Sequence, residues 1–328
     1  MALAALVAGS RVPGRQDTAD PPRSHSVRRS PKGPCTHDRR MADTMREPTA
    51  RFAARLVPVI LGLVTCQVLH AQPADLDTQL VLSTVLLSHP DSTGTAFLLT
   101  RPSPGEPGRT QFLLLTAEHV LGRVKGDETT IIFHRLGPDG GYAKLPVKLR
   151  IRQDGKALWT KHPTADIAAM VVSPPPEVVP PCVPVDRLAS EDDLIRCGIH
   201  PGDTVRCVAF PHPIQFEAGE AGFGVVRTGC IASYPLLPTS KIRTFLVDLN
   251  TFEGDSGGPI YLSEESRNVG GKAEPVQFIV GLMTGQQFID EEFKLIYQTG
   301  KFRHRMGLGI VAPAPAIRET IDLMDRPR

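Results

Sequence analysis

The hydrophobic positions of this chain fall in short runs that predict β-strands rather than helices. From residue 83 onward, apolar segments of strand length are separated by turns rich in Gly, Pro and Asp. Many short strands divided in this way indicate an all-β barrel or sandwich. In the first half we predict strands at Ser83–Leu87, Thr95–Leu99, Phe112–Leu115, Thr130–Phe133, Pro146–Ile151 and Ile167–Val172. In the second half we predict them at Thr204–Phe210, Phe223–Ser233, Arg243–Leu249, Pro259–Leu262, Val276–Thr284 and Gly307–Val311.

A proline-rich stretch over residues 173–185 interrupts the strand pattern in the middle of the chain. Because proline has no N–H to donate to a β-ladder, we expect an extended linker and a domain boundary there. The sequence thus predicts an N-terminal β-barrel over residues 72–175, a linker over 176–200 and a C-terminal β-barrel over 201–328. Ala189–Ile195 is expected to form one helical turn, and Ala316–Met324 an amphipathic C-terminal helix.

The residues before the first strand have two different compositions. Residues 1–44 are rich in Arg, Pro and Ser without an apolar period, so we expect a disordered extension or a mis-assigned start, because Met41 and Met45 follow. In residues 45–71, three arginines precede the apolar run Leu56–Leu69, and Ala71 closes the segment. This order is typical of a secretory signal peptide cleaved after Ala71. The protein is therefore expected to be secreted or periplasmic.

Two alternatives remain for the apolar segment. It could stay uncleaved as an N-terminal membrane anchor, which would be the only contact with a membrane that we expect. It could also belong to a lipoprotein with its lipid on Cys66, although the preceding Thr65 fits that signal poorly.

Charge is distributed unevenly along the chain. The formal net charge is +2, but residues 1–55 hold 11 Lys/Arg against 5 Asp/Glu, which leaves the remainder mildly acidic. We therefore expect no nucleic-acid partner. The histidines show no metal-ligand spacing, and we predict neither a metal site nor a cofactor.

The run Gly254-Asp255-Ser256-Gly257-Gly258-Pro259 carries the candidate chemistry. A serine hydroxyl becomes a nucleophile only when a neighbouring base removes its proton. Glycines permit the tight, partly positive-φ turn that aims backbone N–H groups at a developing oxyanion. Ser256 is therefore the candidate nucleophile.

The partners that such a serine needs occur upstream. His119 lies in Thr116-Ala117-Glu118-His119-Val120, directly after an apolar strand, and Asp166 precedes the strand Ile167–Val172. The order His, Asp, Ser along the chain is one of the known orders of a catalytic triad. His119 is the candidate general base and Asp166 the residue that orients it.

These three motifs resemble those of trypsin/chymotrypsin-like serine peptidases, and the resemblance covers roughly residues 79–325. Further segments, Pro201–Val205, Gly229–Ser233 and Gly307–Ile310, resemble the bacterial exported branch known as the high-temperature-requirement family. Because residue 328 follows soon after the last predicted strand, we do not expect the PDZ domain that usually follows the protease in that branch.

The resemblance implies two six-stranded antiparallel β-barrels with a C-terminal helix, the chymotrypsin-like fold. His119 and Asp166 would come from the first barrel and Ser256 from the second. It also implies an exported serine endopeptidase that hydrolyses polypeptides through an acyl-enzyme. The backbone N–H groups of Gly254 and Ser256 would form the oxyanion hole.

The resemblance further implies where a substrate would bind. Met283, Thr284 and Gly285 would pair with the extended substrate backbone. Asn250 would lie at the base of the primary pocket, next to Thr251. Because Asn250 is neutral, we expect small or apolar side chains at the cleavage site rather than Arg or Lys.

Asp255 raises a separate question about activation. In digestive members of the family the matching acid pairs with a new N-terminus, but this chain has no R-I-V-G-G-like site before Ser83. A buried unpaired carboxylate is costly, so Asp255 needs another partner or access to solvent. We accordingly expect activity without prior cleavage.

Cysteine use and function both leave alternatives open. Of the six cysteines, Cys182, Cys197, Cys207 and Cys230 lie in the predicted mature part, and we favour the bridges Cys182–Cys197 and Cys207–Cys230 over free thiols.

A non-catalytic binding protein and a protease–chaperone on the same fold are the alternative functions. The sequence predicts no oligomeric state.

Overall fold

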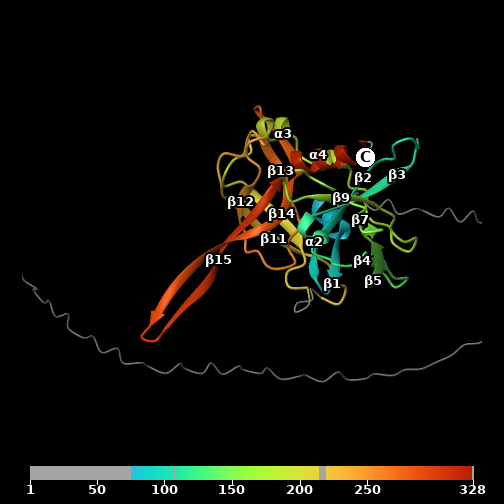
Figure 1. Ribbon diagram of the computed structural model, residues 1–328. Helices are drawn as coiled ribbons and strands as arrows, with labels where there is room; N and C mark the ends of the chain where they lie inside the picture. The colour runs from blue at the N-terminus through green and yellow to red at the C-terminus, as the bar shows by residue number, and fades with distance from the viewer. Residues whose placement is uncertain (1–74, 107, 214–218, 327–328) are drawn as a thin grey trace, which may run out of the picture. The chain divides into compact units, whose positions relative to one another are not determined.

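The computed structural model describes residues 75–106, 108–213 and 219–326. Contacts divide the chain into Met1–Gln67 and Val68–Arg328, and every described residue belongs to the second unit. The predicted extension and signal peptide lie outside the described residues. Within the described ranges, no helix is both long and apolar enough to span a membrane. Strands dominate this unit, as Figure 1 shows.

The first half of the unit forms an antiparallel sheet of seven strands in the order β5-β4-β1-β2-β3-β9-β8. Its central strands are apolar almost throughout because both of their faces are covered, as in the buried run from Leu113 to Leu115 of β3. A separate two-stranded ribbon pairs β6 (Arg152–Gln153) with β7 (Lys156–Ala157). The seven strands are β1 (Thr84–His89), β2 (Ser92–Pro102), β3 (Thr110–Thr116), β4 (Glu128–Leu136), β5 (Tyr142–Arg150), β8 (Thr160–Lys161) and β9 (Ala168–Val172).

This first sheet differs from the predicted six-stranded barrel. It has a seventh strand, and its end strands β5 and β8 do not pair with each other in the described part of the chain. The two-residue β8 is too short to offer a continuous ladder, and β5 alternates exposed with half-buried residues, as an edge strand does. The all-β class is confirmed, but closure of this sheet by hydrogen bonds is not observed.

The second half forms a closed six-stranded barrel in the order β10-β11-β12-β15-β14-β13, as predicted. Its interior is filled by side chains that are fully buried, among them Val205, Val247 and Leu282. The strands are β10 (Thr204–Ala209), β11 (Val225–Ile231), β12 (Phe245–Asp248), β13 (Pro259–Val269), β14 (Lys272–Leu295) and β15 (Gln298–Pro313).

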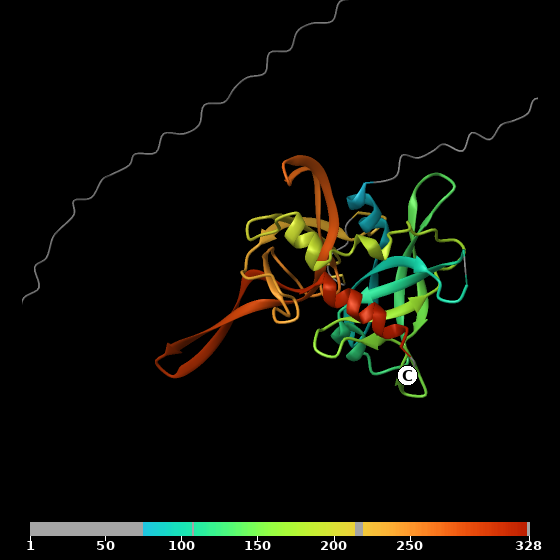
Figure 2. The same cartoon turned by 90° about the horizontal axis from the view of Figure 1, so that it is seen from above.

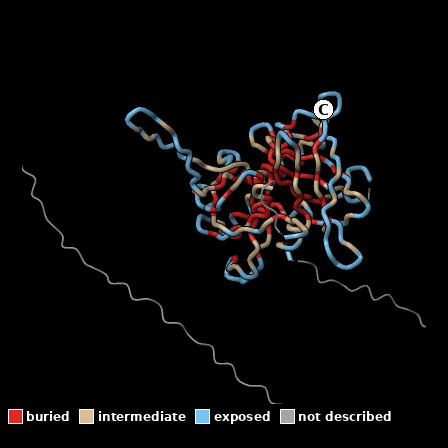
Figure 3. Tube along the Cα trace, turned by 90° about the horizontal axis from the view of Figure 1, so that it is seen from below, coloured by how far each residue is buried: buried red, intermediate tan, exposed pale blue. Residues whose placement is uncertain are grey.

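Strands β14 and β15 run far beyond their predicted ends and form a hairpin that projects from the barrel (Figure 1). One face of the hairpin carries ion pairs, with Asp290 Oδ1 3.0 Å from Arg303 Nε. On the other face the rings of Phe293 and Phe302 stack at 4.7 Å. Figure 3 shows the buried residues concentrated in the two sheets and the hairpin exposed. The strand prediction missed this extension because charged residues interrupt the apolar pattern of the hairpin.

Four α-helices and one 3-10 turn complete the described part of the chain. They are α1 (Leu76–Ser83), α2 (Glu118–Gly122), η1 (Val185–Arg187), α3 (Glu191–Arg196) and α4 (Ala314–Met324). The predicted helices correspond to α3 and α4, whereas α1 was not predicted. Helix α4 packs against β14 of the barrel and against β8 and β9 of the first sheet, so it joins the two (Figure 2).

The segment predicted as a linker is packed against both sheets. The Thr100 N–H of β2 donates to Val183 O at 2.7 Å, and the Ala189 N–H donates to Ile279 O of β14 at 2.8 Å. Val183 and Leu188 are fully buried. The chain therefore passes from one sheet to the other in a fixed path, and the domain boundaries proposed from the sequence stay predictions.

The favoured disulfides do not form, because Cys182, Cys197, Cys207 and Cys230 are free thiols. On the β10–β11 ladder, Cys230 faces Thr204, so it is three residues out of register with Cys207. Three residues of strand span about 10 Å, more than a disulfide can bridge. Burial raises the pKa of the Cys207 thiol to about 12, which keeps it protonated and unreactive.

Candidate active site

Ser256 lies in the turn between β12 and β13, and two glycines give this turn its shape. Gly254 has φ +96° and Gly257 has φ +95°, a conformation that side chains with a Cβ rarely adopt. There is also no space for a Cβ atom at either position. A Cβ on Gly257 would lie 1.8 Å from Thr95 O, and one on Gly254 would lie 2.2 Å from Phe210 O. Only glycine fits at these two positions.

Thr95 of β2 fastens this turn to the first sheet. Its N–H donates to Ser256 O at 2.8 Å, and its hydroxyl donates to Gly254 O at 2.7 Å. On the barrel side, Gly257 N–H donates to Met283 O at 2.7 Å. The nucleophile turn is therefore held by both sheets.

Two backbone N–H groups of the nucleophile turn have no hydrogen-bond partner among the described residues. The carbonyls of Gly254 and Ser256 are occupied by Thr95, but the N–H groups of Gly254 and Ser256 have no acceptor among the described residues. Unpaired N–H groups on the nucleophile residue and two positions before it suit a developing oxyanion.

His119 belongs to the short helix α2, which begins as β3 ends. The first N–H groups of a helix have no partner within it, and the cap residue Ala117 has no side chain that could accept from them. Asp166, in the loop before β9, takes this role: its Oδ1 accepts the His119 N–H at 3.0 Å. Its other oxygen, Oδ2, lies 2.6 Å from His119 Nδ1. One carboxylate thus fixes both the backbone and the ring of His119.

The environment of Asp166 keeps it ionised. Burial opposes ionisation, but bonds from the His119 ring and from the backbone N–H groups of His119 and Glu118 outweigh it. The pKa of Asp166 therefore lies below its ordinary value. A carboxylate bonded to Nδ1 directs the imidazole Nε2 away from itself and stabilises an imidazolium ion.

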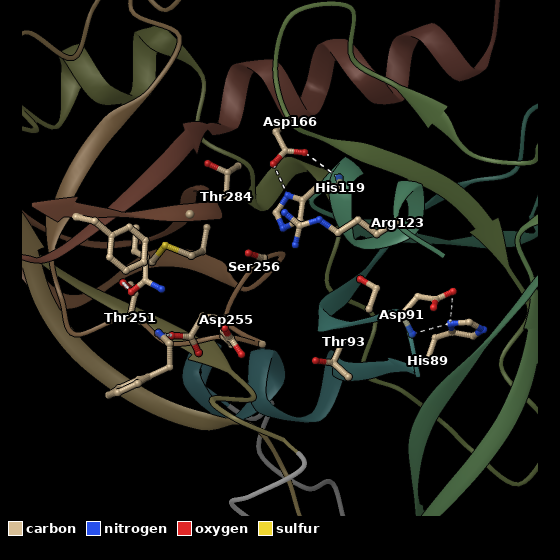
Figure 4. A pocket seen from close by; sticks show the side chains of 18 of the residues that line it. His89, Asp91, Thr93, His119, Arg123, Asp166, Thr251, Asp255, Ser256 and Thr284 are labelled. Carbon is tan, nitrogen blue, oxygen red and sulfur yellow. Dashed lines mark hydrogen bonds and ion pairs between the residues drawn. The ribbon is translucent and has the colours of Figure 1, made fainter. Parts of the chain in front are cut away.

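His119, Asp166 and Ser256 line one cavity of about 780 Å³. Figure 4 shows the three side chains around this space, with Asp166 above His119 and Ser256 below it. No hydrogen bond joins Ser256 to His119 in the described part of the chain. Bonds of this kind are often long without substrate and tighten when it binds.

Arg227 of β11 is the partner that the sequence left open for Asp255. Asp255 is 1% exposed, and its Oδ1 lies 2.6 Å from Arg227 Nη2, an ion pair that is not aligned as a hydrogen bond. Its Oδ2 accepts the Phe252 N–H at 2.7 Å. Burial still raises the pKa of Asp255 above its ordinary value, although the charge of Arg227 opposes this effect.

The residues predicted to bind substrate separate into two groups. Thr251, Met283, Thr284 and Gly285 line the cavity, and Figure 4 shows Thr251 and Thr284 on the same side of Ser256. Asn250 does not line it. Asn250 is exposed, and its Oδ1 faces Gly307 instead. The structure thus removes Asn250 from the place that the family resemblance implied.

Met283 narrows the part of the cavity beside Thr251. A Cβ on Gly309 would lie 2.7 Å from Met283 Cε and 3.0 Å from Thr251 Cγ2, so both side chains pack against Gly309. Both Met283 and Thr251 are buried. Little space remains there for a large side chain.

Three residues of the site were not predicted. Thr95 and Arg227 lie on strands whose pattern showed only apolar alternation, and their partners are far away in sequence. Arg123, which lines the cavity, follows His119 by four residues and was not singled out. Its position one helical turn after the candidate base was the signal that could have identified it.

Comparison with models of known protein families found no match for this chain, and comparison with characterised proteins found none. Among solved structures, it is similar to an inactive serine-to-alanine mutant of Rv3671c from M. tuberculosis H37Rv. The identity is 15%, the TM-score 0.42, and the match covers 77% of this chain and 92% of that one. A second structure, the Rv3671c protease in an inactive form, matches with 14% identity, a TM-score of 0.40 and coverage of 76% and 93%. Scores this low support no conclusion about this chain.

Proposed function

We propose that this protein is a serine endopeptidase that hydrolyses polypeptides through an acyl-enzyme. The observation that carries the proposal is the convergence of Asp166, His119 and Ser256 on one cavity, beside the unpaired N–H groups of Gly254 and Ser256. A nucleophile, a base with its orienting carboxylate, and an oxyanion hole are the parts that acyl transfer to a serine requires.

Each part has a defined step. His119 Nε2 removes the proton of Ser256 as its hydroxyl oxygen attacks the scissile carbonyl, and the carbonyl oxygen becomes an oxyanion bound by the two N–H groups. The C–N bond then breaks while His119 gives the proton to the leaving amine. Water, activated by the same histidine, hydrolyses the ester and releases the acid. Asp166 stays ionised throughout and stabilises the imidazolium ion.

The shape of the cavity favours a small acyl side chain. Met283 and Thr251 occupy the space beside Gly309, which narrows this part of the cavity for bulky groups. This supports small residues such as Ala at the cleavage site and makes Arg or Lys unsuitable. Export of the protein is a further proposal, and it depends only on residues 45–71.

The proposal is tested with the full chain, a fluorophosphonate probe and a casein assay. We expect the probe to label Ser256 and casein to be cleaved. Ser256→Ala should abolish labelling and reduce kcat by about a millionfold, because it removes the nucleophile. His119→Ala should abolish labelling as well, since the hydroxyl loses its base.

Ser173→Ala is the matched control, because Ser173 is exposed and does not line the cavity. It should leave labelling and turnover unchanged. A Ser256→Ala protein that cleaves casein as fast as the parent would contradict the proposal. A wild-type chain that neither reacts with the probe nor cleaves any peptide, but binds peptides, would favour a non-catalytic binding protein.

A further inference from the structure

The cavity continues beyond His119, on the side away from Thr284. Figure 4 shows Thr284 on one side of Ser256 and Arg123, Thr93 and Asp91 on the other. His119 delivers a proton to the leaving amine, so the part of the substrate that departs must lie on the His119 side of Ser256. The acyl part then lies beside Thr284 and Gly285. Arg123 and its neighbours consequently face the departing half of the peptide.

Arg123 is held in position by its backbone. It caps the C-terminus of α2, and its N–H donates to His119 O at 3.2 Å. Its side chain reaches from this helix into the cavity, close to His119 (Figure 4). Arg123 is therefore the cationic side chain that a substrate meets directly after the scissile bond.

The guanidinium of Arg123 has no hydrogen bond or ion pair to any residue in the described ranges. Two neighbouring arginines that do not line the cavity are engaged: Arg227 pairs with Asp255, and Arg152 donates to backbone carbonyls such as Val124 O at 2.7 Å. An arginine presents a planar set of five donors that matches a carboxylate. The donors of Arg123 therefore remain available to a ligand.

Asp91 is the acid on the same side of the cavity. Its Oδ2 accepts the Lys125 N–H at 3.2 Å. The ring of His89 also contacts it: His89 Nδ1 accepts the Asp91 N–H at 3.1 Å and lies 3.5 Å from Asp91 Oδ2. In Figure 4 Asp91 lies beside His89, whereas the side chain of Arg123 extends toward the His119 ring. Because His119 delivers the proton to the leaving amine, the residue next to the scissile bond meets this cation.

On the basis of the proposed function, we propose that Arg123 selects substrates with a carboxylate just after the scissile bond. Two sources supply such a group: the side chain of Asp or Glu in the first or second departing residue, or the C-terminal carboxylate of a peptide that ends there. The hydroxyls of Ser92 and Thr93, which line the same wall, are further donors toward it. Arg123 is thus a specificity residue and takes no part in the chemical steps.

The test uses the full chain and matched peptides with Ala on the acyl side. One set varies only the first departing residue between Glu, Gln and Lys and ends in an amide far from the cleavage site. A second set carries a neutral departing residue and ends, as acid or amide, one or two residues after the bond. The measurement is kcat/KM for each peptide, at low and at high salt.

We expect Glu to be preferred over Gln by about 1.5- to fivefold, the range for one charge pair at an exposed site. The preference should shrink at high salt because the pair is screened. Arg123→Gln should abolish it, and Arg123→Lys should retain part of it, since the charge remains but the planar fork is lost. If peptides that end in a free carboxylate are preferred over those that end in an amide, the C-terminal carboxylate is the group that Arg123 binds.

Arg135→Gln is the matched control, because Arg135 is an exposed arginine of β4 outside the cavity. It should keep the Glu/Gln ratio of the wild type. The proposal is overturned if the ratio is the same in Arg123→Gln as in the wild type, or if neither carboxylate source is preferred. Labelling of Ser256 distinguishes the two failures. A labelled, active enzyme without the preference would contradict only the role of Arg123. A chain that is neither labelled nor active would contradict the proposed endopeptidase activity as well.

Discussion

At the scale of single residues, Arg227 is, with Thr95, a side chain that holds the nucleophile turn in place. Besides pairing with Asp255, its Nη1 donates to Asn250 O at 2.6 Å. It therefore holds the chain at two points before Ser256. Nothing in the local sequence marks this role, because Arg227 lies on a strand and acts on residues more than twenty positions away.

Arg227→Gln is expected to lower the free energy of unfolding by about 3 kcal/mol, because it leaves Asp255 buried without its counter-charge. The double variant Arg227→Gln/Asp255→Asn should recover part of the loss, since the uncompensated charge is gone. Chemical denaturation measures both effects. Arg243→Gln, at an exposed arginine, should change stability little. Additive losses in the double variant would contradict the pairing.

The pH dependence of this variant follows from the sign of the Asp255 shift. Its pKa is raised in the folded state, so the folded chain keeps a proton that the unfolded chain loses. Stability from this group is present below pH 3.8 and falls as pH rises through the folded pKa. The difference between wild type and Arg227→Gln should thus be smaller in acid than at neutral pH.

At the scale of elements, helix α1 is fastened to the C-terminal barrel by Asp77. The carboxylate accepts from the Tyr261 hydroxyl at 2.7 Å and the Ser263 hydroxyl at 3.0 Å, and it pairs with Arg206. Leu76 and Leu80 are buried on the same helix. Burial opposes ionisation of Asp77, but these bonds outweigh it and hold the pKa of Asp77 below its ordinary value.

Asp77→Asn is expected to lower the free energy of unfolding by about 2 kcal/mol, because charge-assisted bonds become neutral ones. The lowered pKa means that this stabilisation is fully present above pH 3.8 and is lost as pH falls through the folded value. Denaturation curves should therefore converge for mutant and wild type in acid. Asp192→Asn, at an exposed acid of α3, is the control. Curves that stay parallel in acid would contradict the assignment.

At the scale of the whole described unit, α4 connects the two halves that supply the site. Two residues of this helix, Ile317 and Ile321, are buried. His162 Nε2 of the first half lies 2.9 Å from Glu319 Oε2, and Arg101 Nη1 lies 2.8 Å from Asp325 Oδ2. Because His119 and Ser256 come from different sheets, the geometry of the site depends on this packing.

Ile317→Ala is expected to cost about 2 to 5 kcal/mol of stability through the cavity that it creates. We also expect kcat/KM for casein to fall, since the two sheets share this contact. Asp322→Ala, at an exposed position of the same helix, should change neither. Denaturation and turnover are measured on the same samples. A destabilised variant that retains full turnover below its unfolding transition would show that α4 does not position the site.

Much of the local structure could be predicted from the sequence. The runs at Phe112–Leu115 and Thr204–Phe210 became β3 and β10, because period and composition act over neighbouring residues. The prediction failed where the pattern was mixed. The hairpin of β14 and β15 alternates charged with apolar residues, and α1 shows no strong amphipathic period. Both depend on partners that a local pattern does not contain.

The sequence by itself determined which chemistry is available: a serine among glycines, a histidine after one buried strand and an aspartate before another. Short-range sterics and hydrophobic period are local, so they can be read along the chain. Only the tertiary structure decided which residues from distant parts of the chain contact one another. It brought Arg227 to Asp255 and Arg123 to the cavity, moved Asn250 out of it, and kept Cys207 and Cys230 out of register. Such pairs depend on strand register and sheet packing, which distant segments settle together.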